Sequence, residues 1–140
     1  VPAIAEKTVA AALAKVKEVT VGVPIFAAGK SFGGRMTSHY LSKTSSSGCK
    51  GLIFYGFPLH PAGKPAITRA AHLSAVETPM LFLQGTRDAL AEISLIREVC
   101  SKLPLAKLVT FEGADHSFRQ GKKDFIEELA TATDAWIASC

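Results

Sequence analysis

The residues most suggestive of chemistry form a G-x-S-x-G segment centred on Ser31. An apolar run, residues 23–28, precedes the segment and a helical pattern follows it, so we expect the serine at a sharp strand-to-helix turn. At such a turn a side chain at Gly29 or Gly33 would crowd the nucleophile and the next helix. The helix N-terminus and the N–H of Phe32 would stabilise an oxyanion beside the serine. The segment therefore predicts a serine nucleophile with Phe32 in the oxyanion hole.

Two other interpretations of this segment need to be weighed. Gly29-Lys30-Ser31 is similar to the end of a phosphate-binding loop, but the first glycine of that motif would fall at position 24, which is Pro24. Proline lacks the backbone N–H that cradles phosphate, so nucleotide binding is disfavoured. The motif alone does not exclude the other interpretation, a structural turn with no chemical role.

A serine hydroxyl needs a histidine to accept its proton. Of the four histidines, His116 is the best placed, because it lies in the loop that follows the last apolar run, residues 105–111. In a parallel sheet that loop emerges at the same edge as Ser31. His39 falls more than two turns along the helix that follows the serine, so we expect it to be a surface or packing residue.

An acid is needed to orient the histidine, and Asp88 and Asp115 compete for this role. Asp88 follows the apolar run 79–84 and would emerge at the same sheet edge. Asp115 adjoins His116 in sequence, and neighbouring side chains diverge, so Asp88 is favoured. The order Ser31, Asp88, His116 is that of nucleophile, acid and base in one known hydrolase arrangement.

Alternating strand and helix patterns are expected to position these residues. An amphipathic helix over residues 3–19 opens the chain, and apolar runs then predict strands over 23–28, 51–57, 79–84 and 105–111. The first three runs are almost wholly apolar, as in parallel strands covered on both faces, and the fourth is expected at an edge. Helical patterns between and after the strands complete a single α/β domain, a three-layer sandwich with a mostly parallel sheet.

Composition narrows the function classes. The 140 residues are 48% hydrophobic and 20% charged with a net charge of +4, which is typical of one globular domain. No apolar stretch approaches a membrane span, and the densest basic cluster, at residues 119–123, has no interleaved aromatic residues, so neither membrane nor nucleic acid is expected as a partner. Three widely spaced cysteines fit neither a disulfide framework nor a zinc site, and we expect a cytoplasmic protein without metal.

Three separated segments carry a family resemblance. Residues 54–65, 83–88 and 113–118, together with the serine motif, resemble the α/β-hydrolase superfamily on its dienelactone-hydrolase-like side, in particular small bacterial predicted hydrolases. They are also similar to a hydrolase-like domain in a subunit of an animal chromatin-modifying complex. The resemblance runs from about Val21 to the C-terminus and implies Ser31 as nucleophile, Asp88 as acid and His116 as base.

The expected reaction is hydrolysis of a small-molecule carboxylic ester through an acyl-enzyme, with no metal or organic cofactor. The alternative is a non-catalytic interaction domain that keeps the hydrolase fold, since a scaffold use is implied by the animal relative.

Residues that would contact the substrate are harder to assign. The long segment 58–78 is expected to form a helix and part of a lid, and it carries His60. Lys30 and Arg35, near the serine, are candidates for attracting an anionic substrate, with His60 as a further substrate-binding candidate. The plainer interpretation, solvated charges and a loop histidine, is the favoured one.

The resemblance also implies strands that precede the serine motif, whereas one helix and one strand precede it here. We therefore expect residues 1–140 to be the C-terminal part of a longer domain, without the loop that supplies the second oxyanion donor. The run 23–28 would then be an exposed sheet edge, through which a homodimer could form. Loss of one oxyanion donor lowers turnover by about 10² to 10³, so we expect weak activity from this chain alone.

Overall fold

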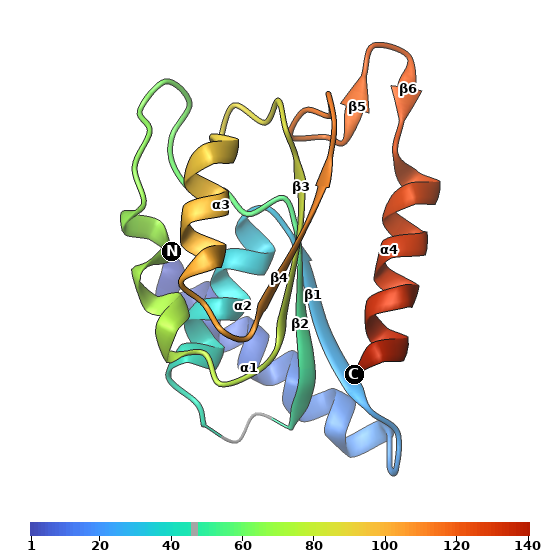
Figure 1. Cartoon of the computed structure of the whole chain (residues 1–140). Helices are drawn as coiled ribbons and strands as arrows, with labels where there is room; N and C mark the ends of the chain where they lie inside the picture. Colours follow the sequence, from blue (N-terminus) through green and yellow to red (C-terminus); the bar gives the residue numbers. More distant parts are fainter. Residues whose placement is uncertain (46–47) are drawn as a thin grey trace.

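A four-stranded parallel sheet forms the centre of the molecule in the computed structural model, which describes residues 1–45 and 48–140 (Figure 1). The strands lie side by side in chain order: β1 (Ile25–Lys30), β2 (Cys49–Tyr55), β3 (Met80–Gly85) and β4 (Ala106–Phe111). Since all three pairings are parallel, the four carboxyl ends meet at one edge of the sheet.

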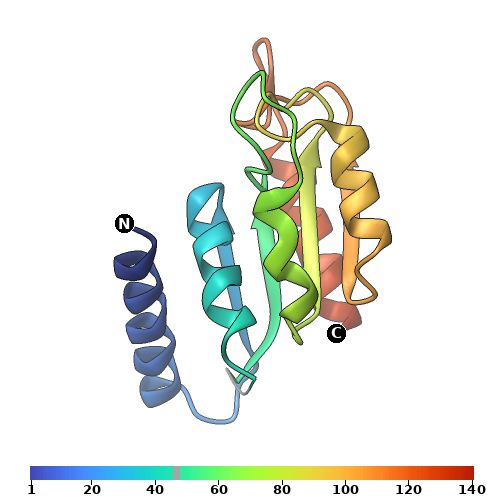
Figure 2. The ribbon, with the colours of Figure 1, turned by 90° about the vertical axis from the view of Figure 1, so that its left-hand side faces the viewer.

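Helices cover both faces of this sheet. They are α1 (Pro2–Val19), α2 (Phe32–Ser42), the 3₁₀ helix η1 (Thr68–Ala75), α3 (Ile93–Ser101) and α4 (Ile126–Ser139). Figure 2 shows α2, η1 and α3 in front of one face and α4 behind the other, with α1 outside α2. The predicted three-layer α/β sandwich is confirmed.

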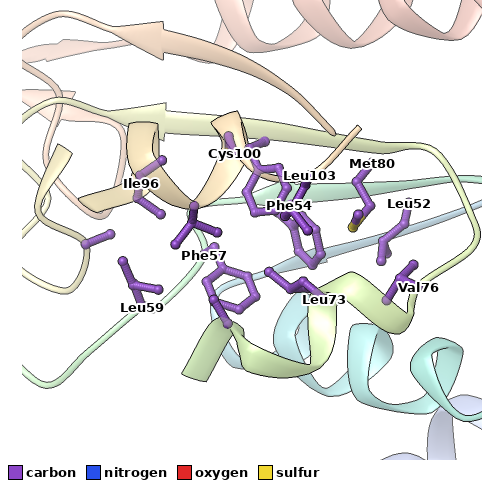
Figure 3. Close-up of a cluster of buried hydrophobic side chains, with 14 of the residues drawn as sticks. Leu52, Phe54, Phe57, Leu59, Leu73, Val76, Met80, Ile96, Cys100 and Leu103 are labelled. Atoms are coloured by element: carbon purple, nitrogen blue, oxygen red, sulfur yellow. The ribbon is translucent and has the colours of Figure 1, made fainter. Parts of the chain in front are cut away.

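Side-chain alternation along the strands explains why both faces are covered. Leu52 and Phe54 of β2 point into the core beneath η1 and α3, while Ile53 points into a second core beneath α4. Figure 3 shows the first of these cores, in which the ring of Phe54 lies between residues from the strands and residues from η1 and α3. Phe54 and Phe82 are both almost fully buried, with ring centroids 4.5 Å apart. A strand that is apolar on both sides therefore needs helices over both faces of the sheet.

The observed bounds of β1 and β2 differ from the predicted ones. β1 begins at Ile25, after Pro24, and runs to Lys30, so Ser31 is the first residue beyond the strand. β2 ends at Tyr55 because Gly56 adopts a left-handed conformation with φ of 75°, which ends the extended backbone.

A short antiparallel ribbon, β5 (Arg119–Gln120) with β6 (Lys123–Asp124), was not predicted. Its four residues are polar and exposed, so no apolar period marks it in the sequence.

The first helix lies against α2 and leaves one side of β1 open. Leu13 is the buried residue of α1, and Lys43 at the end of α2 pairs with Glu6 at 3.0 Å. Val16, an apolar residue of the amphipathic helix predicted over residues 3–19, is 37% exposed. β1 pairs with β2 alone, so its other edge has no strand partner among the described residues. The sequence predicted this exposed edge. Nowhere in the described part of the chain is a helix both long and apolar enough to cross a membrane.

We expect the 140-residue chain to self-associate through the open edge of β1. The N–H of Ser31 donates to the carbonyl of Tyr55 in β2, and alternate residues of a strand face the same neighbour. The N–H of Ala27 therefore faces β2, whereas that of exposed Ala28 faces the open edge. Ala28→Pro should lower self-association in sedimentation velocity across a concentration series while the fold persists.

Ala27→Pro is the matched control, because it removes a hydrogen bond to β2 and should destabilise the fold itself. A wild-type chain that stays monomeric at every concentration, or an Ala28→Pro chain that associates as the wild type does, would contradict this expectation.

Candidate active site

Ser31 occupies a strained turn between β1 and α2. Its backbone has φ of 49° and ψ of −121°, a conformation that non-glycine residues rarely adopt. Two backbone hydrogen bonds hold it there: its N–H donates to Tyr55 at 3.2 Å, and its carbonyl accepts from Arg35 at 3.1 Å. The turn therefore presents the Ser31 hydroxyl at the carboxyl edge of the sheet.

The turn depends on two glycines, and one of them is not the one predicted. A Cβ at Gly29 would lie 2.3 Å from the backbone nitrogen of Gly34, so α2 crosses the end of β1 with no room for a side chain. A Cβ at Gly34 would lie 2.7 Å from the carbonyl oxygen of Gly29. At Gly33 a Cβ would meet nothing within 4 Å, so the prediction that a side chain there would crowd the turn is wrong. The second glycine of the motif faces open space, and the third glycine makes the close contact.

His116 lies in the loop that follows β4, the edge strand opposite β1. The loop that follows β4 first crosses the end of β3, where a Cβ at Gly85 would lie 2.3 Å from the carbonyl oxygen of Ala114. It then crosses the end of β2, where the imidazole of His116 lies over Gly56 at a distance of 3.6 Å from an added Cβ. There Nε2 of His116 lies 2.8 Å from Oγ of Ser31. At Gly85 a side chain would therefore obstruct the loop, whereas at Gly56 an added Cβ would make only ordinary van der Waals contact with the imidazole.

Asp88 lies on the other side of the imidazole. Its Oδ2 is 2.7 Å from Nδ1 of His116, and the Asp88 side chain is only 1% exposed. Burial by itself would raise the pKa of Asp88, but hydrogen bonds from His116, from the N–H of Leu90 and from the amide of Gln84 outweigh it, so the pKa lies below its ordinary value. Asp88 is therefore a carboxylate at neutral pH and can only accept hydrogen bonds.

The charge on Asp88 fixes the tautomer of His116. Because the carboxylate only accepts, the proton of a neutral imidazole is on Nδ1, and Nε2 presents its lone pair to the hydroxyl of Ser31. The hydrogen-bonded series Ser31–His116–Asp88 thus joins residues from the ends of β1, β4 and β3.

Asp115, the competing acid, has a different role. Its Oδ1 accepts hydrogen bonds from the N–H groups of Ser117 at 2.8 Å and Arg119 at 3.0 Å. These bonds shape the loop that carries His116, in the manner of an Asx turn.

Two of the three residues predicted to contact substrate, Lys30 and His60, have protein partners. Nζ of Lys30 donates to the carbonyl of His116 at 2.8 Å and therefore ties β1 to the histidine loop. His60 is buried and lines, with Asp88, a hollow of about 340 Å³. Nδ1 of His60 lies 2.8 Å from the carbonyl of Pro61, and Nε2 accepts the N–H of Glu92 at 2.9 Å. Both ring nitrogens of His60 thus hold loops together, and its sequence-based assignment to the substrate is not supported by these contacts.

Phe32, the predicted oxyanion donor, is the first residue of α2. The first N–H groups of a helix have no acceptor within the helix, so the N–H of Phe32 is available beside Ser31. Its side chain is 46% exposed at the same sheet edge.

Gln84 is a site residue that sequence reasoning missed. Its side chain is fully buried, and Nε2 donates to Oδ2 of Asp88 at 2.8 Å, the same oxygen that faces His116. The available signal was one polar residue at the end of an otherwise apolar run, four positions before Asp88.

Residues 1–138 match the family model described as "Alpha/beta hydrolase domain". The chain belongs to the alpha/beta hydrolase family. The resemblance expected from the sequence is confirmed at this level. Within the described residues of the chain, no three His, Cys, Asp or Glu side chains are grouped to hold a metal.

Solved structures of low sequence identity share the fold. A monoacylglycerol lipase from Paleococcus ferrophilus superimposes with a TM-score of 0.70 at 16% identity, over 96% of this chain and 74% of the lipase. Esterase 2 of Thermogutta terrifontis, phosphoramylated by tabun, gives 0.73 at 21% identity, over 99% of this chain and 63% of the esterase. A predicted CIB-like hydrolase from Thermoplasma acidophilum gives 0.69 at 18% identity, over 96% and 60%. The chain thus spans less than two thirds of the length of the last two proteins.

The contacts at the turn predict unequal effects of substitutions at two glycines of the serine motif. Gly29→Ala places a methyl group against the backbone of Gly34 and should lower the free energy of unfolding by about 1–3 kcal/mol or more. Gly33→Ala meets no neighbour and restricts the unfolded chain, so its stability should be unchanged or higher by about 0.4–1 kcal/mol. Urea unfolding of both variants measures the difference, and equal losses would show that the close approach is not what limits the turn.

Proposed function

We propose that this chain is a serine hydrolase that cleaves carboxylic esters through an acyl-enzyme intermediate. The observation that carries the proposal is the pair of hydrogen-bond distances, 2.8 Å from Ser31 to His116 and 2.7 Å from His116 to Asp88. The strained conformation of Ser31 supports it, because such strain concentrates at functional sites.

In the first half of the reaction, Oγ of Ser31 attacks the ester carbonyl carbon as Nε2 of His116 takes the hydroxyl proton. The carboxylate of Asp88 stabilises the resulting imidazolium through Nδ1–H. The N–H of Phe32 donates to the oxyanion of the tetrahedral intermediate. When the intermediate collapses, His116 gives its proton to the departing alkoxide, which leaves as the alcohol, and the acyl group stays on Ser31.

In the second half, water attacks the acyl carbon and His116 takes one of its protons. Collapse of the second tetrahedral intermediate breaks the bond to Oγ, and His116 returns the proton to Ser31. The carboxylic acid is released, and the residues are back in their starting protonation states. No step requires a group other than these side chains, the Phe32 N–H and water.

A second candidate function is that of a non-catalytic interaction domain. The observation that favours it is the free edge of β1, which can accept a strand from another chain. The two candidates differ in whether the hydroxyl of Ser31 is reactive.

A fluorophosphonate probe separates these two candidates. An activated serine displaces fluoride at phosphorus, so we expect covalent labelling of Ser31, seen by mass spectrometry as modification of the peptide that contains it. Ser31→Ala should abolish labelling, while Ser117→Ala, in the adjacent loop, should leave it intact. A folded wild-type chain that the probe does not label would favour the interaction domain.

Asp88→Asn should lower ester turnover by about 10⁴, because an amide no longer holds the imidazole in the required tautomer. Asp115→Asn should have a much smaller effect, since the Asp115 oxygen that accepts the two backbone N–H groups is retained as the amide oxygen. Steady-state kcat for one ester substrate checks both variants. Equal losses of kcat in the two variants, or a larger loss for Asp115→Asn, would show that Asp88 is not the acid that orients His116.

A further inference from the structure

Gln84 is a polar side chain in an otherwise apolar strand. It lies near the end of β3, the strand between β2 and β4 (Figure 1), and its side chain is fully buried. Nε2 of Gln84 donates to Oδ2 of Asp88 at 2.8 Å and has a longer contact, at 3.4 Å, with the carbonyl of Gly85. Because a carboxylate only accepts hydrogen bonds, the NH₂ group must be the side of the amide that faces Asp88.

The other side of the same amide has no partner. Oε1 of Gln84 is buried and accepts no hydrogen bond in the described part of the chain. A buried acceptor without a donor lowers stability and offsets what the bond to Asp88 contributes, so an apolar side chain of similar size would serve the fold about as well. Stability of the fold therefore does not explain why a glutamine occupies the end of β3. The bond to Asp88 is the remaining explanation.

The carboxylate of Asp88 is held at both of its oxygens. Oδ1 accepts the N–H of Leu90 at 2.8 Å, while Oδ2 accepts from Gln84 and lies 2.7 Å from Nδ1 of His116. Leu90 is itself fixed, because its carbonyl accepts the N–H of His60 at 3.0 Å. Rotation of the carboxylate would break at least one of these bonds. The donors from the end of β3 and from the loop after it therefore aim Oδ2 at the imidazole.

We propose that Gln84 is a positioning residue whose side-chain amide holds Oδ2 of Asp88 toward Nδ1 of His116. This inference rests on the proposed esterase function and adds to it a residue that acts only through Asp88. A carboxylate held in one orientation keeps the imidazole in the tautomer and the plane that attack by Ser31 requires. The fold thus tolerates the unpartnered Oε1 because the same amide aligns Asp88.

Gln84→Met tests the proposal with a side chain of nearly the same length that cannot donate a hydrogen bond. We expect kcat for one ester to fall by about 10-fold with KM unchanged, because the lost charge-assisted hydrogen bond aligns the acid and does not bind substrate. The midpoint of urea unfolding should stay close to the wild-type value, because removal of the unpartnered Oε1 offsets the lost bond. An unchanged kcat would overturn the proposal, and so would a fall in kcat that comes with a lower unfolding midpoint.

Gln120→Met is the matched control for this substitution. It removes the same amide from the other glutamine of the chain, which lies in β5 and is exposed. Its kcat, KM and unfolding midpoint should equal those of the wild-type chain. An equal fall of kcat in the two variants would show that the effect is not transmitted through Asp88, and it would overturn the proposal.

Nuclear magnetic resonance tests the alignment of Asp88 without turnover. The chain has two glutamines and no asparagine, so its side-chain amide spectrum holds two NH₂ groups, and Gln120→Met leaves only that of Gln84. A charge-assisted hydrogen bond draws electron density from its proton, so we expect one Gln84 amide proton downfield of both Gln120 protons. In Gln84→Met the Nδ1–H signal of His116 should broaden, because a carboxylate that is free to rotate lets this proton exchange with water.

These signals separate the positioning role from the proposed reaction. A Gln84 amide proton at the position of the Gln120 protons, or an Nδ1–H signal that stays sharp in Gln84→Met, would overturn the positioning role even if the wild-type chain is an active esterase. A deshielded Gln84 proton and a broadened Nδ1–H signal, with no turnover and no fluorophosphonate labelling of the wild type, would support the alignment of Asp88 and reject the proposed reaction. The amide measurement leaves Gln84 unchanged, so it decides the matter even if Gln84→Met does not fold.

Discussion

The contact between the end of β1 and the start of α2 is the constraint on which the site depends. Gly29 and Gly34 bring two backbones closer than any side chain would allow, and Ser31 between them is forced into a left-handed conformation. A wider turn would carry the serine hydroxyl away from Nε2 of His116. It would also shift the start of α2, and with it the Phe32 N–H.

Burial of charge is the second determinant of the site. Asp88 sits in a position that would by itself favour the neutral acid, and three donors from different elements keep it ionised. Gln84 contributes one of them from the end of β3, while its own Oε1 is buried without a partner among the described residues. The polar interior at this edge is thus arranged around one carboxylate, which in turn sets the proton on His116. The apolar layers beneath hold these groups at fixed separations.

Much of this arrangement could be predicted from the sequence. The almost wholly apolar runs predicted a parallel sheet, and that topology brings the ends of separate strands to one edge. Ser31, Asp88 and His116 could therefore be placed together from the sequence alone. What the patterns could not supply was the identity of contacts across the chain. Gly33 matched the motif, yet the crowded position is Gly34, because α2 begins at Phe32 and the third glycine faces β1.

Charged and polar side chains were the hardest to predict. From the sequence, the side chains of Lys30 and His60 were candidates for binding substrate. In the structure each has a hydrogen-bond partner that is distant in sequence or lies in an irregular loop. Gln84 carried no motif, and its significance comes only from its hydrogen bond to Asp88. The spacing of apolar residues predicts which side of a helix or strand is buried. It does not predict hydrogen bonds between elements, because these depend on how the loops cross the ends of the strands.

The loop after β4 also has a consequence for the order in which the molecule forms. It passes over the ends of β3 and β2 to place His116 beside a serine 85 residues earlier in the chain. The contact between Ser31 and His116 therefore forms only when all four strands are in register. Contacts between such distant segments form late and slowly during folding. Reactivity of the Ser31 hydroxyl would consequently report the completed sheet, since a partly folded chain holds the serine but has no base to accept its proton.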